Sequence, residues 1–125
     1  MKKTVNIPNA PDPVGPYSQA VIHNDLMLAS GQIAIDPNSG KLIKGHVASE
    51  LEQILKNIDA LLNAADLKRE NILKCSIFLK NMDDFNDVNE IYANYFSEPY
   101  PARETVEVSR LPKDVNIEIS FIAAK

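Results

Sequence analysis

Apolar residues recur at intervals of three and four after Val47, and this pattern restricts the fold more than any other in the chain. The residues concerned are Leu51, Ile54, Leu55, Ile58, Leu61, Leu62 and Ala65. Their spacing places them on one side of an α-helix. The opposite side carries charged residues that we expect to face solvent, namely Glu50, Glu52, Lys56 and Asp59. A helix of this kind must bury its apolar side against another element. The sequence therefore predicts a helix that begins near Val47 and covers a second layer of structure.

Five other segments have the composition of β-strands. They are residues 17–23, 26–30, 72–80, 104–109 and 115–123. Asn24 and Asp25 tolerate tight-turn geometry, so the first two strands are predicted to form a hairpin. Residues 9–16 contain three prolines and a glycine, which predicts an ordered loop. Residues 36–40 have the composition of a turn, which predicts that residues 33–43 form a short looped segment before the helix.

A second helix is predicted between the third and fourth strands. Its apolar positions are Phe85, Val88, Ile91, Tyr92, Tyr95 and Phe96. Asn81 or Asp83 can cap its N-terminus, and Pro99 and Pro101 prevent its continuation. Strands grouped with two separate helices indicate an α+β fold in which one sheet face carries both helices. A chain of 125 residues with 45% hydrophobic content fits a single domain spanning residues 1–125.

The sheet face without helices is predicted to be half apolar. Phe78 and Ile122 lie there among the polar residues Ser76, Ser120 and Thr105. Such a face is more favourably placed against another subunit than in water. The pattern therefore indicates self-association.

Motifs for cofactor and metal chemistry are absent from the sequence. His23 and His46 are isolated, and Cys75 is the single cysteine, so a metal site would lack ligands. No serine-hydrolase elbow, phosphate-binding loop or dinucleotide fingerprint occurs. The net charge of −4 and the scattered lysines argue against a nucleic-acid partner. There is no signal peptide or long apolar run, so we expect a cytoplasmic protein without membrane contact.

Arg103 and Glu118 are the charged residues best placed for chemistry. Arg103 opens a strand on a side with few apolar neighbours, where its guanidinium could bind a planar carboxylate through two parallel hydrogen bonds. A surface ion pair with Glu107 or another acid is the simpler alternative. Glu118 lies on the side of the last strand away from the core. It could orient a water molecule and relay a proton, or it could be an ordinary solvated residue.

Three further residues could border a binding cleft. Tyr17 follows Gly15 and Pro16, and the rigid turn fixes its ring either as a structural plug or as a pocket wall. Phe85 and Asn89 lie one helical turn apart, and core or capping roles suit them equally well. The residues alone leave these alternatives open.

Several segments together resemble the RidA (YjgF) family. The motifs are residues 15–20 (Gly-Pro-Tyr-Ser-Gln-Ala), 30–34 (Ser-Gly-Gln-Ile-Ala), 89–92 (Asn-Glu-Ile-Tyr), 101–103 (Pro-Ala-Arg), 110–114 (Arg-Leu-Pro-Lys-Asp) and 117–119 (Ile-Glu-Ile). The resemblance covers nearly the whole chain. It implies a chorismate-mutase-like (YjgF-like) fold with a mixed β-sheet, and a homotrimer with its pockets in the clefts between subunits.

The resemblance also implies an activity. The family's best-described members are 2-iminobutanoate/2-iminopropanoate deaminases, which hydrolyse the imines released by pyridoxal-phosphate dehydratases to 2-oxo acids and ammonia. Arg103 then binds the substrate carboxylate, Glu118 positions the attacking water, and Tyr17 lines the site. Backbone groups near Ser30, Gly31 and Thr105 hold the imine, and Gly31 lets the substrate approach the backbone closely. No cofactor is required.

One position departs from the family pattern. Many relatives carry a cysteine where this chain has Thr105, which places any thiol-dependent property in doubt but preserves the backbone contact. Two other functions remain as alternatives. The protein could bind or sense small 2-oxo acids without turnover. The less favoured alternative is a ribonuclease or translation inhibitor, which the acidic charge and the absence of a histidine pair oppose.

Overall fold

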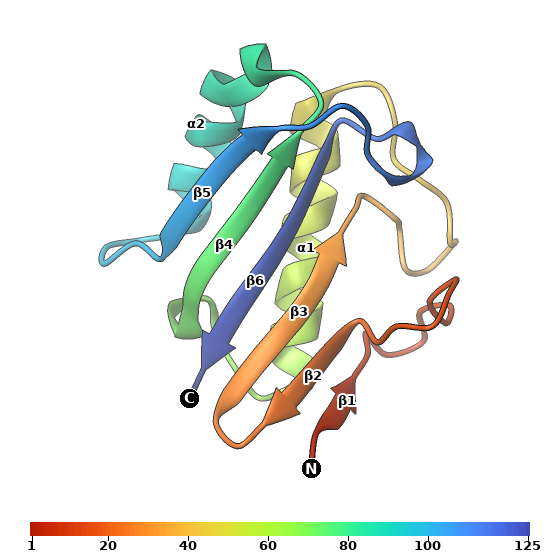
Figure 1. Cartoon of the computed structure of the whole chain (residues 1–125), viewed down its shortest axis with the longest axis vertical. Coiled ribbons are helices and arrows are strands. Elements are labelled where there is room, and N and C mark those ends of the chain that lie inside the picture. The colour runs from red at the N-terminus through yellow and green to blue at the C-terminus, as the bar shows by residue number, and fades with distance from the viewer.

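The computed structural model describes residues 1–125 and contains one six-stranded sheet with both α-helices on the same face (Figure 1). The strands are β1 (Lys3–Val5), β2 (Ala20–His23), β3 (Leu26–Gln32), β4 (Ile72–Leu79), β5 (Ala102–Glu107) and β6 (Ile117–Ala124). Their order across the sheet is β1-β2-β3-β6-β4-β5. All neighbouring strands are antiparallel except β4 and β5, so the sheet is mixed. Strands β1 and β5 form its two edges.

The helices are α1 (Val47–Ala64) and α2 (Phe85–Tyr95). Short 3-10 turns at Arg69–Asn71, Met82–Asp84 and Pro112–Asp114 connect other elements. All seven apolar positions predicted for α1 are buried, and the core lies between this helix layer and the sheet. No helix is both long enough and apolar enough to cross a membrane.

The predicted elements are present, with shifted ends. Strand β1 was not predicted. The first predicted strand is β2, which starts at Ala20, so Tyr17 lies in the preceding loop, and β3 continues past Ser30 to Gln32. Strand β5 begins and ends two residues earlier than predicted, and β6 begins two residues later. Asn81 accepts a hydrogen bond from the backbone of Asp83 and caps the 3-10 turn rather than α2 itself. The excursion after β3 is closed by a bridge between Ile35 and Leu42.

Glu50 was predicted to face solvent and does not. Its side chain is buried, with the residue only 2% exposed. The carboxylate accepts hydrogen bonds from the backbone N–H of Asn116, at 2.9 Å, and from the Asn116 side-chain amide. The carbonyl of Asn116 accepts from the N–H of Lys80 at 3.0 Å. A buried carboxylate is tolerated because hydrogen bonds compensate its lost hydration, and here those bonds hold the chain just before β6.

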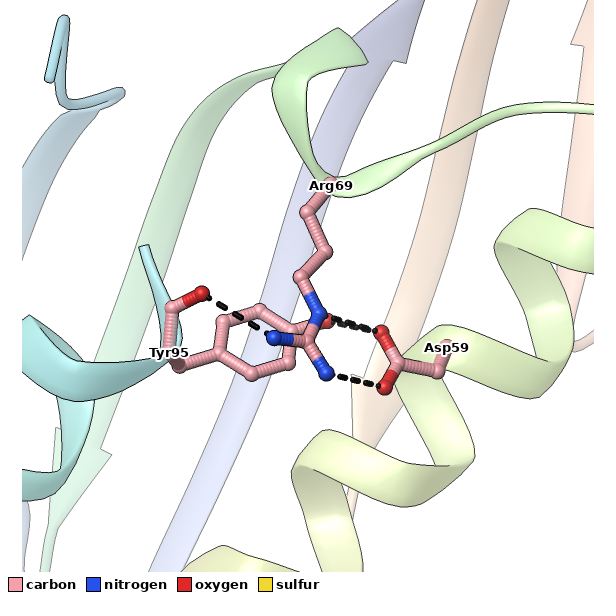
Figure 2. A network of polar contacts seen from close by, with 3 residues as sticks. All are labelled: Asp59, Arg69 and Tyr95. Carbon is pink, nitrogen blue, oxygen red and sulfur yellow. Dashed lines mark hydrogen bonds and ion pairs between the residues drawn. The ribbon is translucent and has the colours of Figure 1, made fainter. Parts of the chain in front are cut away.

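A polar cluster of Asp59, Arg69 and Tyr95 ties the two helices together (Figure 2). Arg69 donates two hydrogen bonds to the carboxylate of Asp59 on α1, at 3.0 and 2.8 Å, and one to the carbonyl of Tyr95 on α2, at 3.2 Å. The Tyr95 hydroxyl donates to Asp59 at 2.6 Å, and the guanidinium lies 4.0 Å from the Tyr95 ring centre. Bidentate geometry of this kind is more stabilising than a simple surface ion pair. The cluster fixes α2, which carries residues of the site described next.

Candidate functional site

A cavity of about 460 Å³ opens beside the end of β3. The proline-rich loop before β2 supplies one wall, with Tyr17 at its end, and Gly31 and Glu118 supply another. Tyr17 is 55% exposed, and its backbone N–H donates to the carbonyl of Gly15 at 3.0 Å. Gly15 has a φ of 133°, in the region that favours glycine, so the turn in front of Tyr17 depends on this residue. The structure thus brings together Tyr17, Gly31 and Glu118, which the family resemblance had placed at one site.

Glu118 lies on the sheet face away from the helices. It pairs with Phe78 of β4 in the ladder, while its neighbours Ile117 and Ile119 point into the core. The carboxylate is half-buried and has no hydrogen-bond or ion-pair partner in the chain. Desolvation by burial therefore raises the pKa of Glu118 above its ordinary value. A carboxylate with free lone pairs and a raised pKa is suited to accept a proton from water.

Gly31 is in contact with Glu118, and this contact gives the glycine a second role. A Cβ atom on Gly31 would lie 2.6 Å from both Cδ and Oε2 of the Glu118 side chain. The glycine therefore provides the space in which the carboxylate lies. Next to it, the hydroxyl of Ser30 donates to the carbonyl of Ser18 at 2.6 Å, which joins β3 to the loop before β2.

Arg103 lies on the opposite side of the sheet, contrary to the prediction. Its ladder partner is Cys75, which points into the core, so Arg103 faces the helix layer at the edge of the sheet. The guanidinium carbon lies 4.9 Å from the ring centre of Tyr92 and 5.6 Å from that of Phe85, both on α2. Its Nη1 donates to the side chain of Asn89 at 2.6 Å. Phe85 and Asn89 thus contact Arg103, and this agrees with the interpretation that they border a cleft.

The ion-pair alternative for Arg103 is wrong. Glu107 accepts a hydrogen bond from the backbone N–H of Met82 at 2.8 Å. Glu104 points to the other sheet face, where it binds Lys74 and Ser76. Arg103 therefore has no acidic partner in the chain, and it is exposed. Held by one amide and two aromatic rings, the guanidinium keeps most of its donors free for an anion.

Thr105 is the second residue that the sequence placed on the wrong face. It pairs with the buried Ile77, so its side chain points toward the helices. The hydroxyl is buried and has no hydrogen-bond partner. Only its backbone on the edge strand is available to a ligand, as expected for this position.

Replacing Thr105 by valine should stabilise the protein. On folding, the Thr105 hydroxyl loses its hydrogen bonds to water and forms none in the protein. The isosteric change removes this cost, so we expect the free energy of unfolding to rise by about 1 kcal/mol. Urea unfolding at matched protein concentration measures this change. Thr4→Val, at an exposed position of β1, is the matched control and should change stability by less than about 0.5 kcal/mol. A loss of stability in Thr105→Val would mean that the hydroxyl has a partner.

The predicted site residues thus form two groups on opposite faces of one sheet. The first group is Tyr17, Gly31 and Glu118, which line the cavity, with Ser30 beside Gly31 in β3. The second group lies at the edge formed by β5 and α2 and consists of Arg103, Asn89, Phe85 and Thr105. A ligand bound to Glu118 of one chain cannot reach Arg103 of the same chain, because the sheet separates them.

Sequence reasoning missed two residues beside these groups. Tyr92 stacks on Arg103, and its position three residues after Asn89 on the same helix could have indicated this. Lys113 lines the cavity of Glu118 from the turn before β6, and only its place in the Arg-Leu-Pro-Lys-Asp motif pointed to it.

Metal or thiol chemistry has little support in this arrangement. No three side chains among histidine, cysteine, aspartate and glutamate are grouped so that they could hold a metal ion. Cys75 is buried, and desolvation raises the pKa of its thiol to about 11, so it is inert near neutral pH.

Comparisons with known proteins identify the family. The model of the family described as "Endoribonuclease L-PSP" matches residues 7–125. A RutC family protein of Pyrococcus horikoshii is 49% identical over 125 residues, which cover 100% of this chain and 99% of that protein. The human 2-iminobutanoate/2-iminopropanoate deaminase is 43% identical over 123 residues, covering 98% of this chain and 90% of that protein. A crystal structure of a Rid-family protein of unknown function from Yersinia pestis matches with a TM-score of 0.95 and 44% identity, covering all of both chains. The chain therefore belongs to the Endoribonuclease L-PSP family, which is the RidA (YjgF) family that its sequence motifs resemble.

Proposed function

We propose that this protein hydrolyses reactive 2-imino acids to 2-oxo acids and ammonia, with 2-iminopropanoate and 2-iminobutanoate among its substrates. The observation that carries the proposal is the half-buried, unpartnered carboxylate of Glu118 in a cavity wall, beside Tyr17 and Gly31. The name of the human relative supports the reaction. The free, oriented guanidinium of Arg103 supports an anionic substrate.

The two groups of residues act together only if two copies of the chain meet. In this proposal the edge of one copy, with Arg103, docks beside the cavity of the next copy, with Glu118. The helix-free sheet face offers apolar surface for this contact, since Leu28 and Val106 are 44% and 41% exposed. A contact that joins two different surfaces forms a closed ring when its rotation divides a full turn evenly, and we propose a ring of three copies, a homotrimer.

Hydrolysis in this site needs positioning and one proton relay. Arg103 binds the substrate carboxylate through parallel hydrogen bonds. Glu118 accepts a proton from water as the water oxygen attacks the imine carbon, and the resulting tetrahedral adduct releases ammonia when its nitrogen is protonated. An iminium carboxylate and one water thus give a 2-oxo acid and an ammonium ion, and no electrons are exchanged. Holding water, imine and base in one orientation supplies most of the acceleration.

An imine-trapping assay tests this reaction. A dehydratase generates 2-iminopropanoate or 2-iminobutanoate, semicarbazide traps the imine, and the adduct is followed with and without the protein. We expect wild type to suppress the adduct.

The raised pKa of Glu118 also sets the pH dependence of the reaction. The base works only when it is ionised, so the rate should fall as the pH decreases through the pKa of Glu118. That pKa lies above the ordinary value of about 4.3.

Two results would count against the proposal. If wild type leaves the adduct unchanged, the protein is not an imine deaminase, and binding of 2-oxo acids without turnover becomes the better function. If the adduct is suppressed but Glu118→Gln retains full activity, Glu118 is not the base, and the fall in rate at low pH comes from another group. The Glu118→Gln protein should still bind a 2-oxo acid, because Arg103 is unchanged.

A further inference from the structure

The cavity of Glu118 is much larger than its smallest proposed substrates need. Its volume is about 460 Å³, whereas the side chains of 2-iminopropanoate and 2-iminobutanoate are a methyl and an ethyl group. The imine carbon must lie beside the Glu118 carboxylate, so a longer side chain would extend into the remaining space. The groups that line this space therefore determine which longer substrates can bind.

Lys113 is the only cation in the lining. Its ammonium group makes no hydrogen bond or ion pair within the chain. The two other charged lining residues are Asp12 and Glu118, which both repel an anion. Lys113 is exposed, and it is the position next to which an anionic group in the cavity is favoured.

Asp114, the acidic residue next to Lys113 in this turn, is already paired with Arg110. Lys113 has a φ of 57° and a ψ of 21°, between Pro112 and Asp114. Asp114 accepts two hydrogen bonds from Arg110, at 2.7 and 3.2 Å. This bidentate pair, with Lys80 and Lys44 nearby, lowers the pKa of Asp114. The positive charge of Lys113 is consequently available to a ligand rather than to its neighbour in sequence.

We infer that Lys113 binds a second carboxylate and that the site accepts dicarboxylic 2-imino acids. This inference rests on the proposed function, since it requires the imine carbon at Glu118 and the first carboxylate at Arg103. A charge-assisted hydrogen bond between an ammonium and a carboxylate is stronger than one to a neutral amide. 2-Iminosuccinate is a short substrate of this class, because one methylene group separates its reacting carbon from the second carboxylate.

A matched pair of substrates isolates the effect of charge. An oxidase acting on aspartate supplies 2-iminosuccinate, and one acting on asparagine supplies 2-iminosuccinamate, which has the same shape without the second charge. We expect wild type to prefer 2-iminosuccinate about tenfold in kcat/KM after subtraction of spontaneous hydrolysis. Lys113→Gln should lose this preference, and Lys113→Arg should keep it. Lys56→Gln, which removes an exposed lysine of α1 outside the cavity, should behave as wild type.

Binding of unreactive ligands separates this inference from the proposed function. Titrations of the same proteins with succinate and succinamate, followed by NMR, need no turnover. A Lys113-dependent preference for succinate without hydrolysis of any imine would support carboxylate binding by Lys113 and remove the deaminase proposal. Hydrolysis of both imines at equal efficiency in wild type, together with equal binding of succinate and succinamate, would overturn the inference and leave the deaminase standing.

Discussion

Mixing two inactive variants, Arg103→Ala and Glu118→Gln, is expected to restore about a quarter of the wild-type deaminase activity. The two residues lie on opposite faces of the sheet. In the proposed assembly each site therefore takes its arginine from one copy and its glutamate from the next. In a ring assembled at random from equal amounts of both variants, half of the arginine positions and half of the glutamate positions are intact. About one site in four then contains both groups. Each variant alone contains no complete site.

The experiment requires exchange of subunits. The variants are mixed, dissociated in mild denaturant, reassembled, and assayed by imine trapping, with exchange verified by mass spectrometry of the intact assembly. Each variant taken through the same procedure alone is the control and should stay inactive. If verified mixed assemblies remain inactive, the two residues do not form a shared site, and the proposed arrangement of copies is wrong.

Sequence patterns predicted most of the elements because their signals are local. The three-and-four spacing of α1 and the prolines that end α2 depend on residues close in the chain, and the structure confirms both helices. Turn residues likewise identified the hairpin of β2 and β3. Strand ends were less certain, since they depend on where a neighbouring strand offers partners.

The face of β5 could not be predicted in this way. Alternation groups Arg103 with Thr105 but does not say which group points to the helices. On this edge strand the residues facing the helices, Arg103, Thr105 and Glu107, are more polar than those facing away, so composition points to the wrong face. Only the parallel register with β4, which sets Arg103 beside Cys75, decides the question. Glu118 was easier to place, because Ile117 and Ile119 mark the core side of a central strand.

Glu50 shows a related limit. Glu50 lies on the polar side of α1 in the sequence pattern. Its carboxylate is nevertheless buried, because it accepts hydrogen bonds from Asn116, 66 residues later. A tertiary hydrogen bond of this range leaves no periodic trace in the sequence. The same holds for Lys113, because the turn before β6 and the loop before β2 line one cavity although they are far apart in the sequence.

Gly31→Ala is expected to reduce kcat by about a hundredfold while it leaves the fold intact. The added Cβ would lie 2.6 Å from the carboxyl group of Glu118 and 2.9 Å from its Cγ, closer than real side chains approach. The end of a glutamate side chain can move away at little cost, so the expected result is a displaced base rather than a destabilised protein. General base catalysis contributes about 100-fold or more, and that contribution is lost when the carboxylate leaves the water it orients. Imine trapping measures kcat, and thermal unfolding should show little change.

A second background distinguishes two roles for this glycine. Sequence reasoning assigned Gly31 to close approach of the substrate, whereas the structure shows Glu118 in the space beside it. If the glycine acts through Glu118, adding Gly31→Ala to the Glu118→Ala variant should cost no further activity, because no carboxylate remains to be displaced. If the substrate itself occupies the space, the added methyl group should lower activity by the same factor in both backgrounds. Non-additive losses would therefore establish that Gly31 positions the base, and additive losses would return it to the role of a substrate contact.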